Sequence, residues 1–272
     1  MFLRRLAIAL VTTLGAVLAL APPAHAEPLT YTALGDSYSS GTGTREYYPD
    51  SGDCLRSKHA YPVLTAARLG AALTFAACSG ARVNGVLTGQ LASLNAATNY
   101  VTVSAGGNDI GWGSVITQCA KPWPYTCWGE IDNAENQIRT VLPGRLDQLY
   151  TRIRELAPTA RVVVVGYPRL FNGEECNLIA RISPGEQAEL NAAADLLATT
   201  IQARAAAHRF GFVDARGPFT GHAVCDDVEW INGTSWPLNE SYHPNRAGQV
   251  GYTGLVETAL RSPAARATGR RG

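Results

Sequence analysis

The sequence contains a serine and a histidine in settings that suit nucleophilic catalysis. Ser37 stands in the segment GDS, directly after the apolar run 29–34, and His243 stands in the segment SYHPN near the end of the chain. A serine hydroxyl is a weak nucleophile unless an adjacent base accepts its proton, which an imidazole can do. Serine also caps helices and occupies turns, so Ser37 alone proves little. The pair suggests acyl transfer.

The remaining four histidines are weaker candidates for the base. His25 lies in the N-terminal leader, and His59, His208 and His222 have no suggestive neighbours, so we interpret these three as surface or structural imidazoles. If His243 is the base and keeps an ordinary pKa near 6.5, activity should fall on the acid side and persist toward alkaline pH.

Acyl transfer also requires hydrogen-bond donors directed at the oxyanion. Asn108, in the segment GGND, offers a side-chain amide on a loop where glycines allow close approach of the backbone, and Gly80, in the segment CSGA, offers a bare N–H. Either segment could instead be a simple turn or a packing glycine. Their combination with Ser37 and His243 is more specific than any one of them.

The elements that must position these residues alternate between strands and helices. Such alternation favours a parallel sheet, and the run VVVV without polar alternation is typical of a strand covered on both faces. Ligands of open parallel sheets bind beyond the carboxyl ends of the strands, where the polar segments above are located. The expected strands are 29–34, 72–77, 99–105, 160–168 and 210–215, and the expected helices are 58–70, 130–157, 184–209 and 245–260.

The four segments in this order resemble those of the SGNH, or GDSL, hydrolase superfamily, in particular its secreted actinomycete lipases, esterases and A1-type phospholipases. The resemblance maps the family's Ser, Gly, Asn and His onto Ser37, Gly80, Asn108 and His243. It implies a flavodoxin-like three-layer α/β/α sandwich with a five-stranded parallel sheet of order 2-1-3-4-5. It also implies an oxyanion hole made by the Ser37 and Gly80 N–H groups and the Asn108 amide.

The chain departs from the family pattern beside the histidine. The family usually places an aspartate three residues before it, and this chain has Glu240 there. In similar relatives a main-chain carbonyl two residues before the histidine accepts the imidazole N–H, which here would be that of Ser241. We favour the Ser241 carbonyl as the group that orients His243, with Glu240 as the alternative.

The ends of the chain predict export. Residues 1–26 combine a basic start, an apolar run and an Ala-His-Ala site, which is typical of a secretory signal peptide. We expect one hydrolase domain over 27–260 and a disordered Ala/Arg-rich tail over 261–272. Six cysteines in an exported chain imply three disulfides, whose pairing the count alone leaves open. The resemblance implies sequential bridges, Cys54–Cys78, Cys119–Cys127 and Cys176–Cys225.

Charge and spacing exclude several other classes of function. The formal charge of +1 falls to −1 without the two arginines of 1–26, so the chain lacks the basic surplus that nucleic-acid binding needs. No C-x-x-C and no histidine pair at ligand spacing suggests a metal site. We expect no metal, no organic cofactor, no nucleic acid, no stable membrane insertion, transient contact with a lipid surface, and a monomer.

The sequence therefore predicts a secreted serine esterase that hydrolyses carboxylic esters of lipids, such as acylglycerols and glycerophospholipids. A carbohydrate or aryl esterase of the same superfamily is the alternative, and an inactive secreted binding module is a remote one. Several apolar residues in the loops could line an acyl groove or could instead pack beneath disulfide-braced loops. These residues are Tyr47, Tyr48, Trp112, Trp123, Trp128, Trp236 and Leu238.

Overall fold

The computed structural model describes residues 28–176 and 181–262. Five parallel strands form one sheet of order β2-β1-β3-β4-β5, which confirms the expected fold and strand order. The strands are β1 (Thr30–Gly35), β2 (Ala72–Phe75), β3 (Tyr100–Ser104), β4 (Arg161–Val165) and β5 (Gly211–Val213). The signal peptide and most of the tail that we expect lie outside the described residues.

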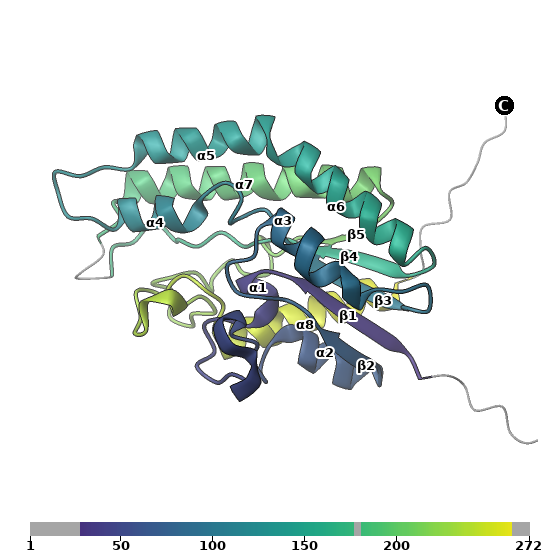
Figure 1. The fold of residues 1–272 in the computed structure, drawn as a ribbon. Helices are drawn as coiled ribbons and strands as arrows, with labels where there is room; N and C mark the ends of the chain where they lie inside the picture. Colours follow the sequence, from purple (N-terminus) through teal and green to yellow (C-terminus); the bar gives the residue numbers. More distant parts are fainter. Residues whose placement is uncertain (1–27, 177–180, 263–272) are drawn as a thin grey trace, which may run out of the picture.

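Helices cover both faces of this sheet (Figure 1). In the order of the chain, the α-helices are α1 (Ser37–Ser40), α2 (Tyr61–Leu69), α3 (Val83–Gly85), α4 (Trp112–Cys119), α5 (Trp128–Thr140), α6 (Leu142–Leu156), α7 (Pro184–Ala207) and α8 (Arg246–Arg261). Helices α5, α6 and α7 lie on one face, and α2 and α8 lie together on the other. Short 3-10 and π turns span Pro49–Cys54, Val86–Gln90, Leu91–Ser93 and Leu238–Glu240.

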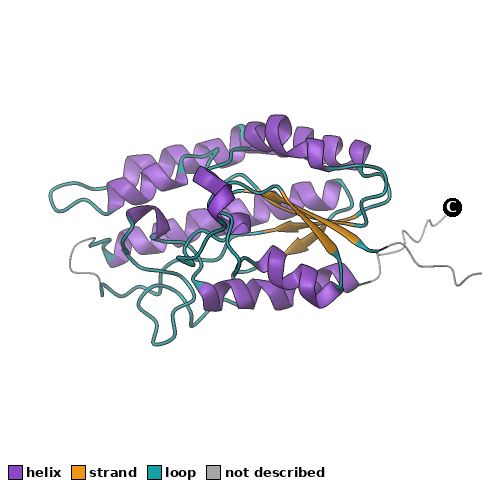
Figure 2. Ribbon diagram, turned by 60° about the horizontal axis from the view of Figure 1, so that its bottom comes forward, coloured by secondary structure: helices purple, strands orange, loops and turns teal. Residues whose placement is uncertain are grey.

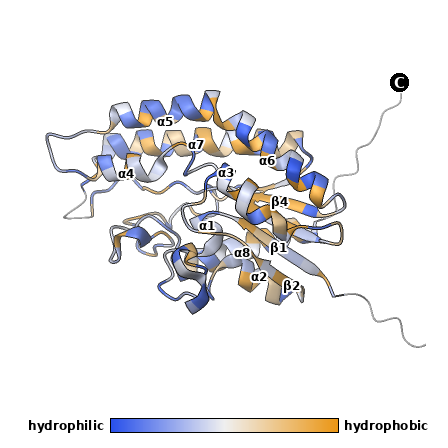
Figure 3. Ribbon diagram, viewed as in Figure 1, coloured by the Kyte–Doolittle hydropathy of each residue, from blue (hydrophilic) through white to orange (hydrophobic). Residues whose placement is uncertain are grey.

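The core lies between the sheet and these two helical layers. Residues Val162 to Val165 of β4 are all buried, as expected for a strand that helices cover on both faces. Figure 3 shows β4 as mostly hydrophobic, while α5 and α6 alternate hydrophobic and hydrophilic residues, as amphipathic helices do. The edge strand β2 is partly exposed. The central strands β1 and β3, whose ends carry the polar loops, are therefore rigidly embedded.

The structure corrects two of the expected helix boundaries. The single helix expected over 130–157 is two helices, α5 and α6, which meet at Val141. Pro143 explains the break, because it has no N–H and its ring clashes with the preceding helical turn. Helix α8 also extends to Arg261, one residue into the segment expected to be a disordered tail.

The expected start of α7 is confirmed. Ser183 accepts a hydrogen bond from the Glu186 N–H, Glu186 bonds back to the Ser183 backbone, and Pro184 is the first helical residue. Such a capping box satisfies two backbone donors that a helix start leaves free. The start of α7 is thereby fixed beside the loops at the carboxyl end of the sheet (Figure 2).

The three disulfides are those that the resemblance implied. They join Cys54 to Cys78, Cys119 to Cys127 and Cys176 to Cys225. The second joins the end of α4 to the start of α5, and the first ends two residues before Gly80. The loops around the carboxyl ends of the strands are therefore constrained by covalent bonds as well as by packing.

Candidate active site

A tight turn from β1 into α1 positions Ser37 at the first residue of that helix. Gly35 has φ +126°, and a Cβ there would lie 2.5 Å from the Ser104 carbonyl oxygen, so no larger residue fits without displacement. The side-chain amide of Gln90 accepts from the Gly35 N–H at 2.7 Å and donates to its carbonyl at 2.9 Å. The turn that carries the serine is thus fixed on both sides.

Ser37 and His243 are hydrogen-bonded to each other. The Oγ of Ser37 lies 2.7 Å from Nε2 of His243, although the two residues are 206 positions apart in the sequence. Nδ1 of the same ring lies 2.9 Å from the Ser241 carbonyl oxygen. A carbonyl only accepts hydrogen bonds, so Nδ1 carries the proton and Nε2 presents its lone pair to the serine hydroxyl. This is the tautomer that a general base requires.

Partial burial of the ring keeps His243 neutral. Desolvation lowers its pKa to about 4, and the hydrogen bond to the Ser241 carbonyl opposes this effect. The imidazole is therefore uncharged, and able to accept a proton, above about pH 4. The sequence-based expectation of an ordinary pKa near 6.5 is corrected downward.

Glu240 does not contact the imidazole. Its buried carboxylate accepts a hydrogen bond from the Tyr47 hydroxyl at 2.6 Å, and its other oxygen lies 3.6 Å from Nε of Arg45. Tyr47 in turn accepts the Gly43 N–H at 3.2 Å. Glu240 therefore braces the histidine loop against the segment that follows α1, while the Ser241 carbonyl faces the ring.

Two further residues hold the histidine loop against that segment. The backbone of Asn232 donates to the His243 carbonyl and accepts from the Tyr242 N–H, both at 2.9 Å, and its amide donates to the Gly43 carbonyl at 2.8 Å. At Gly43, with φ +102°, a Cβ would lie 2.9 Å from Cβ of His243 and 2.7 Å from the Pro244 carbonyl. The backbone of residue 43 thus packs directly against the histidine.

The proposed oxyanion donors occupy the loops after β2 and β3. The amide of Asn108 donates to the Ala81 carbonyl at 3.0 Å, which orients the side chain and leaves its second N–H available. Asp109 fixes the same two loops, because it accepts from the Val83 N–H at 2.8 Å and from Arg145 at 3.0 Å. Gly80 is exposed and has φ +76°, a conformation that favours glycine.

A buried carboxyl lies directly beneath the nucleophile. Asp36 caps α1 by accepting the Tyr38 N–H at 3.1 Å, and the Tyr167 hydroxyl donates to its other oxygen at 2.5 Å. Burial raises the pKa of Asp36 to about 7, against the opposing effect of these hydrogen bonds. Tyr38 also packs near the His243 ring and donates from its hydroxyl to the Tyr242 carbonyl at 3.0 Å.

Ser37, Asn108 and His243 border a pocket of about 480 Å³. One wall comes from α4 and α7, and the other from the loop that precedes His243. Apolar residues dominate the lining away from the polar groups, among them Trp112, Ile116, Ala120, Leu170, Leu197 and Leu238. The arrangement can hold an apolar chain next to a serine that has a base within reach.

Several residues of this site could not be predicted from the sequence. Gln90, Tyr167 and Asn232 hold the catalytic loops through hydrogen bonds, yet each lies in a segment without a recognisable motif. Tyr167 had one usable signal, since it lies two residues after the buried strand β4 at the carboxyl edge of the sheet. Among the loop aromatics, Trp112 lines the pocket, whereas Tyr47 is bound to Glu240 and Trp123 and Trp236 face solvent.

Comparisons with known proteins find one family and several similar chains. Residues 33–250 match the GDSL-like Lipase/Acylhydrolase family. Lipase 1 of Streptomyces coelicolor is 44% identical over 234 residues, which are 85% of this chain and 85% of that protein.

Two solved structures are similar over the same part of the chain. The extracellular lipase of Streptomyces rimosus has a TM-score of 0.81 at 40% identity, and the phospholipase A1 of Streptomyces albidoflavus has a TM-score of 0.81 at 41% identity. Each comparison covers 85% of this chain and 99% of the other. Ser37, Gly80, Asn108 and His243 all lie within the region that matches the family.

Proposed function

Because the chain belongs to the GDSL-like lipase/acylhydrolase family, we propose that it hydrolyses carboxylic ester bonds of lipids, with Ser37 as nucleophile and His243 as base. One observation carries this proposal. The Ser37 hydroxyl lies 2.7 Å from an imidazole nitrogen whose lone pair is directed at it by the bond between Nδ1 and the Ser241 carbonyl. That geometry activates a serine for attack on an acyl carbon.

In this mechanism His243 accepts the Ser37 proton as the serine oxygen attacks the ester carbonyl. The negative charge on the carbonyl oxygen is stabilised by the Ser37 and Gly80 N–H groups and the Asn108 amide. His243 then donates its proton to the departing alkoxide, which leaves an acyl-enzyme on Ser37. Water attacks this ester, His243 takes the proton from the water, and the proton returns to the serine oxygen as the carboxylic acid is released. The Ser241 carbonyl holds the ring during both proton transfers.

Two observations support lipids as the substrate class. The pocket beside Ser37 is lined mainly by apolar side chains of α4, α7 and the histidine loop, which suits an acyl chain better than a sugar. The similar proteins named above are called lipases and a phospholipase A1. Acylglycerols and glycerophospholipids are accordingly the esters that we propose.

We further propose that residues 1–26 are removed on export and that the protein acts outside the cell as a monomer. The three disulfides favour an oxidising compartment, and one similar protein is described as an extracellular lipase. All groups of the site come from one chain. Within residues 28–176 and 181–262, no helix is both long and apolar enough to cross a membrane.

Hydrolysis of p-nitrophenyl butyrate tests the nucleophile. Ser37→Ala should remove turnover, because the hydroxyl that attacks the carbonyl is absent, while circular dichroism should match that of the wild type. Initial rates of the wild type on phosphatidylcholine, tributyrin, longer triglycerides and acetylated xylan test the substrate class. Full activity of Ser37→Ala would refute the mechanism, and a preference for acetylated xylan would refute the lipid assignment.

A further inference from the structure

Two loops carry the three most exposed large apolar side chains of the described residues, those of Trp123, Trp236 and Leu238. Trp123 is 90% exposed and Tyr125 is 59% exposed, both in the loop 120–127 between α4 and α5. Trp236 is 81% exposed and Leu238 is 63% exposed, both in the segment 233–239 before His243. Indole and phenol groups exposed to this degree usually mark a surface that contacts something else.

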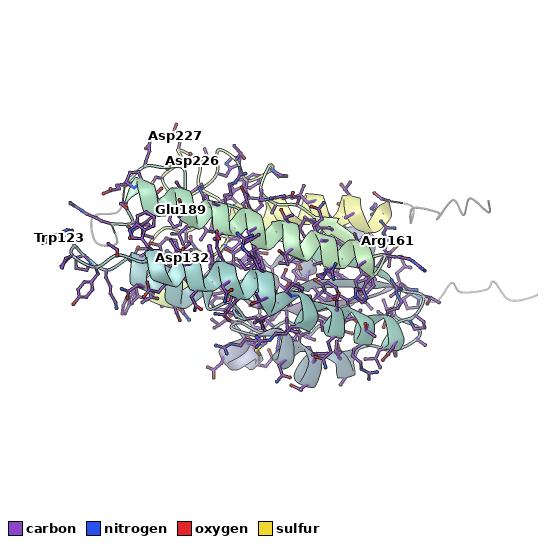
Figure 4. All side chains as sticks on the ribbon, turned by 90° about the horizontal axis from the view of Figure 1, so that it is seen from above. Trp123, Asp132, Arg161, Glu189, Asp226 and Asp227 are labelled. Carbon is purple, nitrogen blue, oxygen red and sulfur yellow. A yellow bond between two sulfur atoms is a disulfide. The ribbon has the colours of Figure 1, made fainter. Side chains whose placement is uncertain are left out.

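These two loops flank the entrance to the catalytic pocket. Ile116 and Ala120, at the end of α4, line one wall, and the loop with Trp123 follows directly. Thr234 and Leu238 line the opposite wall, and Trp236 lies between them in the sequence. Figure 1 shows the loop between α4 and α5 and the yellow-green segment before His243 extending beyond α1 at the same end of the molecule. In Figure 4, Trp123 lies at the extremity of that end, opposite Arg161.

Both loops are constrained at their bases. The disulfide Cys119–Cys127 closes the first loop, which also contains Pro122 and Pro124. In the second, the hydroxyl of Ser241 accepts a hydrogen bond from the Ser235 N–H at 2.9 Å, and Pro237 follows Trp236. Side chains presented on constrained loops lose less conformational entropy when they bind.

The charges of these loops suit a lipid headgroup layer. The loop 120–127 contains Lys121 and no acidic residue, and the segment 233–239 contains no charged residue. The next carboxylate, that of Glu240, is buried against Tyr47. No carboxylate on either loop therefore opposes lipid phosphates, and Trp and Tyr are the residues that favour the boundary between headgroups and acyl chains.

We propose that Trp123, Tyr125, Trp236 and Leu238, which we call the hydrophobic rim, dock onto the surface of aggregated lipid. This inference rests on the proposed function, because it states the physical form in which the lipid ester is recognised. Docking places the pocket entrance against the lipid layer, so that an acyl chain enters from the layer without crossing water. Trp123, Tyr125 and Trp236 do not line the pocket, whereas Leu238 belongs both to the hydrophobic rim and to the pocket wall.

The double variant Trp123→Ser/Trp236→Ser separates docking from chemistry. Its kcat/KM on dissolved p-nitrophenyl butyrate should stay within about twofold of the wild type, because the catalytic groups are untouched. Its rate on phosphatidylcholine vesicles should fall at least ~10-fold, because two large aromatic side chains no longer leave water for the lipid. Leu29→Ser is the control and should change neither rate, since Leu29 is 40% exposed at the amino end of β1, away from the pocket.

Direct binding distinguishes failure of this inference from failure of the proposed function. Co-sedimentation with phosphatidylcholine vesicles is measured for Ser37→Ala alone and for Ser37→Ala combined with the two rim substitutions, so that turnover plays no part. The docking role of the hydrophobic rim would be refuted if vesicle binding survives the rim substitutions. It would also be refuted if these substitutions lower the rates on vesicles and on p-nitrophenyl butyrate equally. A wild-type dimer that the rim substitutions convert to a monomer in size-exclusion chromatography would assign the surface to a second copy instead. If the protein binds vesicles but hydrolyses no lipid ester, the docking role of the hydrophobic rim is supported and the proposed lipid substrate class is refuted.

Discussion

At the scale of single residues, the surroundings of His243 keep its imidazole unprotonated at a pH at which a solvated imidazole would bind a proton. A general base needs a free lone pair, and an imidazole in water is partly protonated at mildly acidic pH. Here the Ser241 carbonyl fixes the proton on Nδ1, and desolvation lowers the pKa to about 4. The ring is consequently a weaker base than a solvated histidine, but it is available at lower pH.

The acid limb of the pH profile should reflect this environment. We expect kcat/KM for p-nitrophenyl butyrate to fall with a midpoint near pH 4 rather than near 6.5, because kcat/KM reports the free enzyme and the substrate does not titrate. Rates between pH 3 and 9 give the midpoint, and recovery of activity after return to pH 7 shows that unfolding is not responsible. A midpoint near 6.5 would mean that the imidazole is solvated in the free enzyme.

At the scale of elements, the site depends on how closely the segment after α1 approaches the histidine loop. Residue 43 contacts both His243 and Pro244, and Asn232 bonds to the backbone on either side of that contact. Glu240 and Tyr47 add a second bridge between the same two segments. The distance between Ser37 and His243 is therefore set by loop packing and not by the sheet alone.

Gly43→Ala should damage catalysis much more than folding. The added methyl group would lie 2.9 Å from Cβ of His243, so the ring must move, and a misplacement of about 1 Å can cost ~100-fold in rate. Gly70→Ala is the matched control, because Gly70 also has positive φ, at +63°, but has open space around its Cβ position. We expect Gly70→Ala to lower the free energy of unfolding by about 1 kcal/mol and to leave the activity unchanged. Equal kcat values for the two variants, measured with p-nitrophenyl butyrate, would contradict the packing argument.

The sequence predicts the strands better than it predicts these contacts. Apolar runs marked all five strands, and burial on two faces leaves the pattern uninterrupted in a central strand such as β4, at Val162–Val165. The break at Val141 was missed although Pro143 is visible in the sequence, since the amphipathic pattern continues across it. The bracing roles of Asn232 and Tyr47 could not be predicted, because their partners lie about 190 residues away and depend on the packed fold. Ser37, Asn108 and His243 could be proposed as site residues because each occupies a short motif.

At the scale of the whole molecule, the site affects how stability depends on pH. Two buried groups beside each other titrate in opposite senses. His243 has a folded pKa of about 4 and binds a proton more readily when unfolded, so it makes stability rise as pH increases from 4 to 6.5. Asp36 has a folded pKa of about 7 and an ordinary value of 3.8, so it makes stability fall as pH increases across 3.8 to 7. The two contributions offset each other over most of that window.

Substituting either His243 or Asp36 should reveal the contribution of the other residue to the pH dependence of the free energy of unfolding. In His243→Gln only the contribution of Asp36 remains, so the wild type should gain stability over this variant as pH rises from 4 to 6.5, by at most ~1.4 kcal/mol per pH unit. Asp36→Asn should show the opposite trend, because it retains the contribution of His243. Urea unfolding of the oxidised protein at pH 4.5, 5.5 and 6.5 gives the free energies of unfolding.

Ser37→Ala is the control, since it disturbs the same hydrogen bond without removing a titrating group. Its curve of unfolding free energy against pH should run parallel to that of the wild type. Parallel curves for all four proteins would show that neither group is held away from its solvated pKa, and the offsetting pair would then have no role in stability.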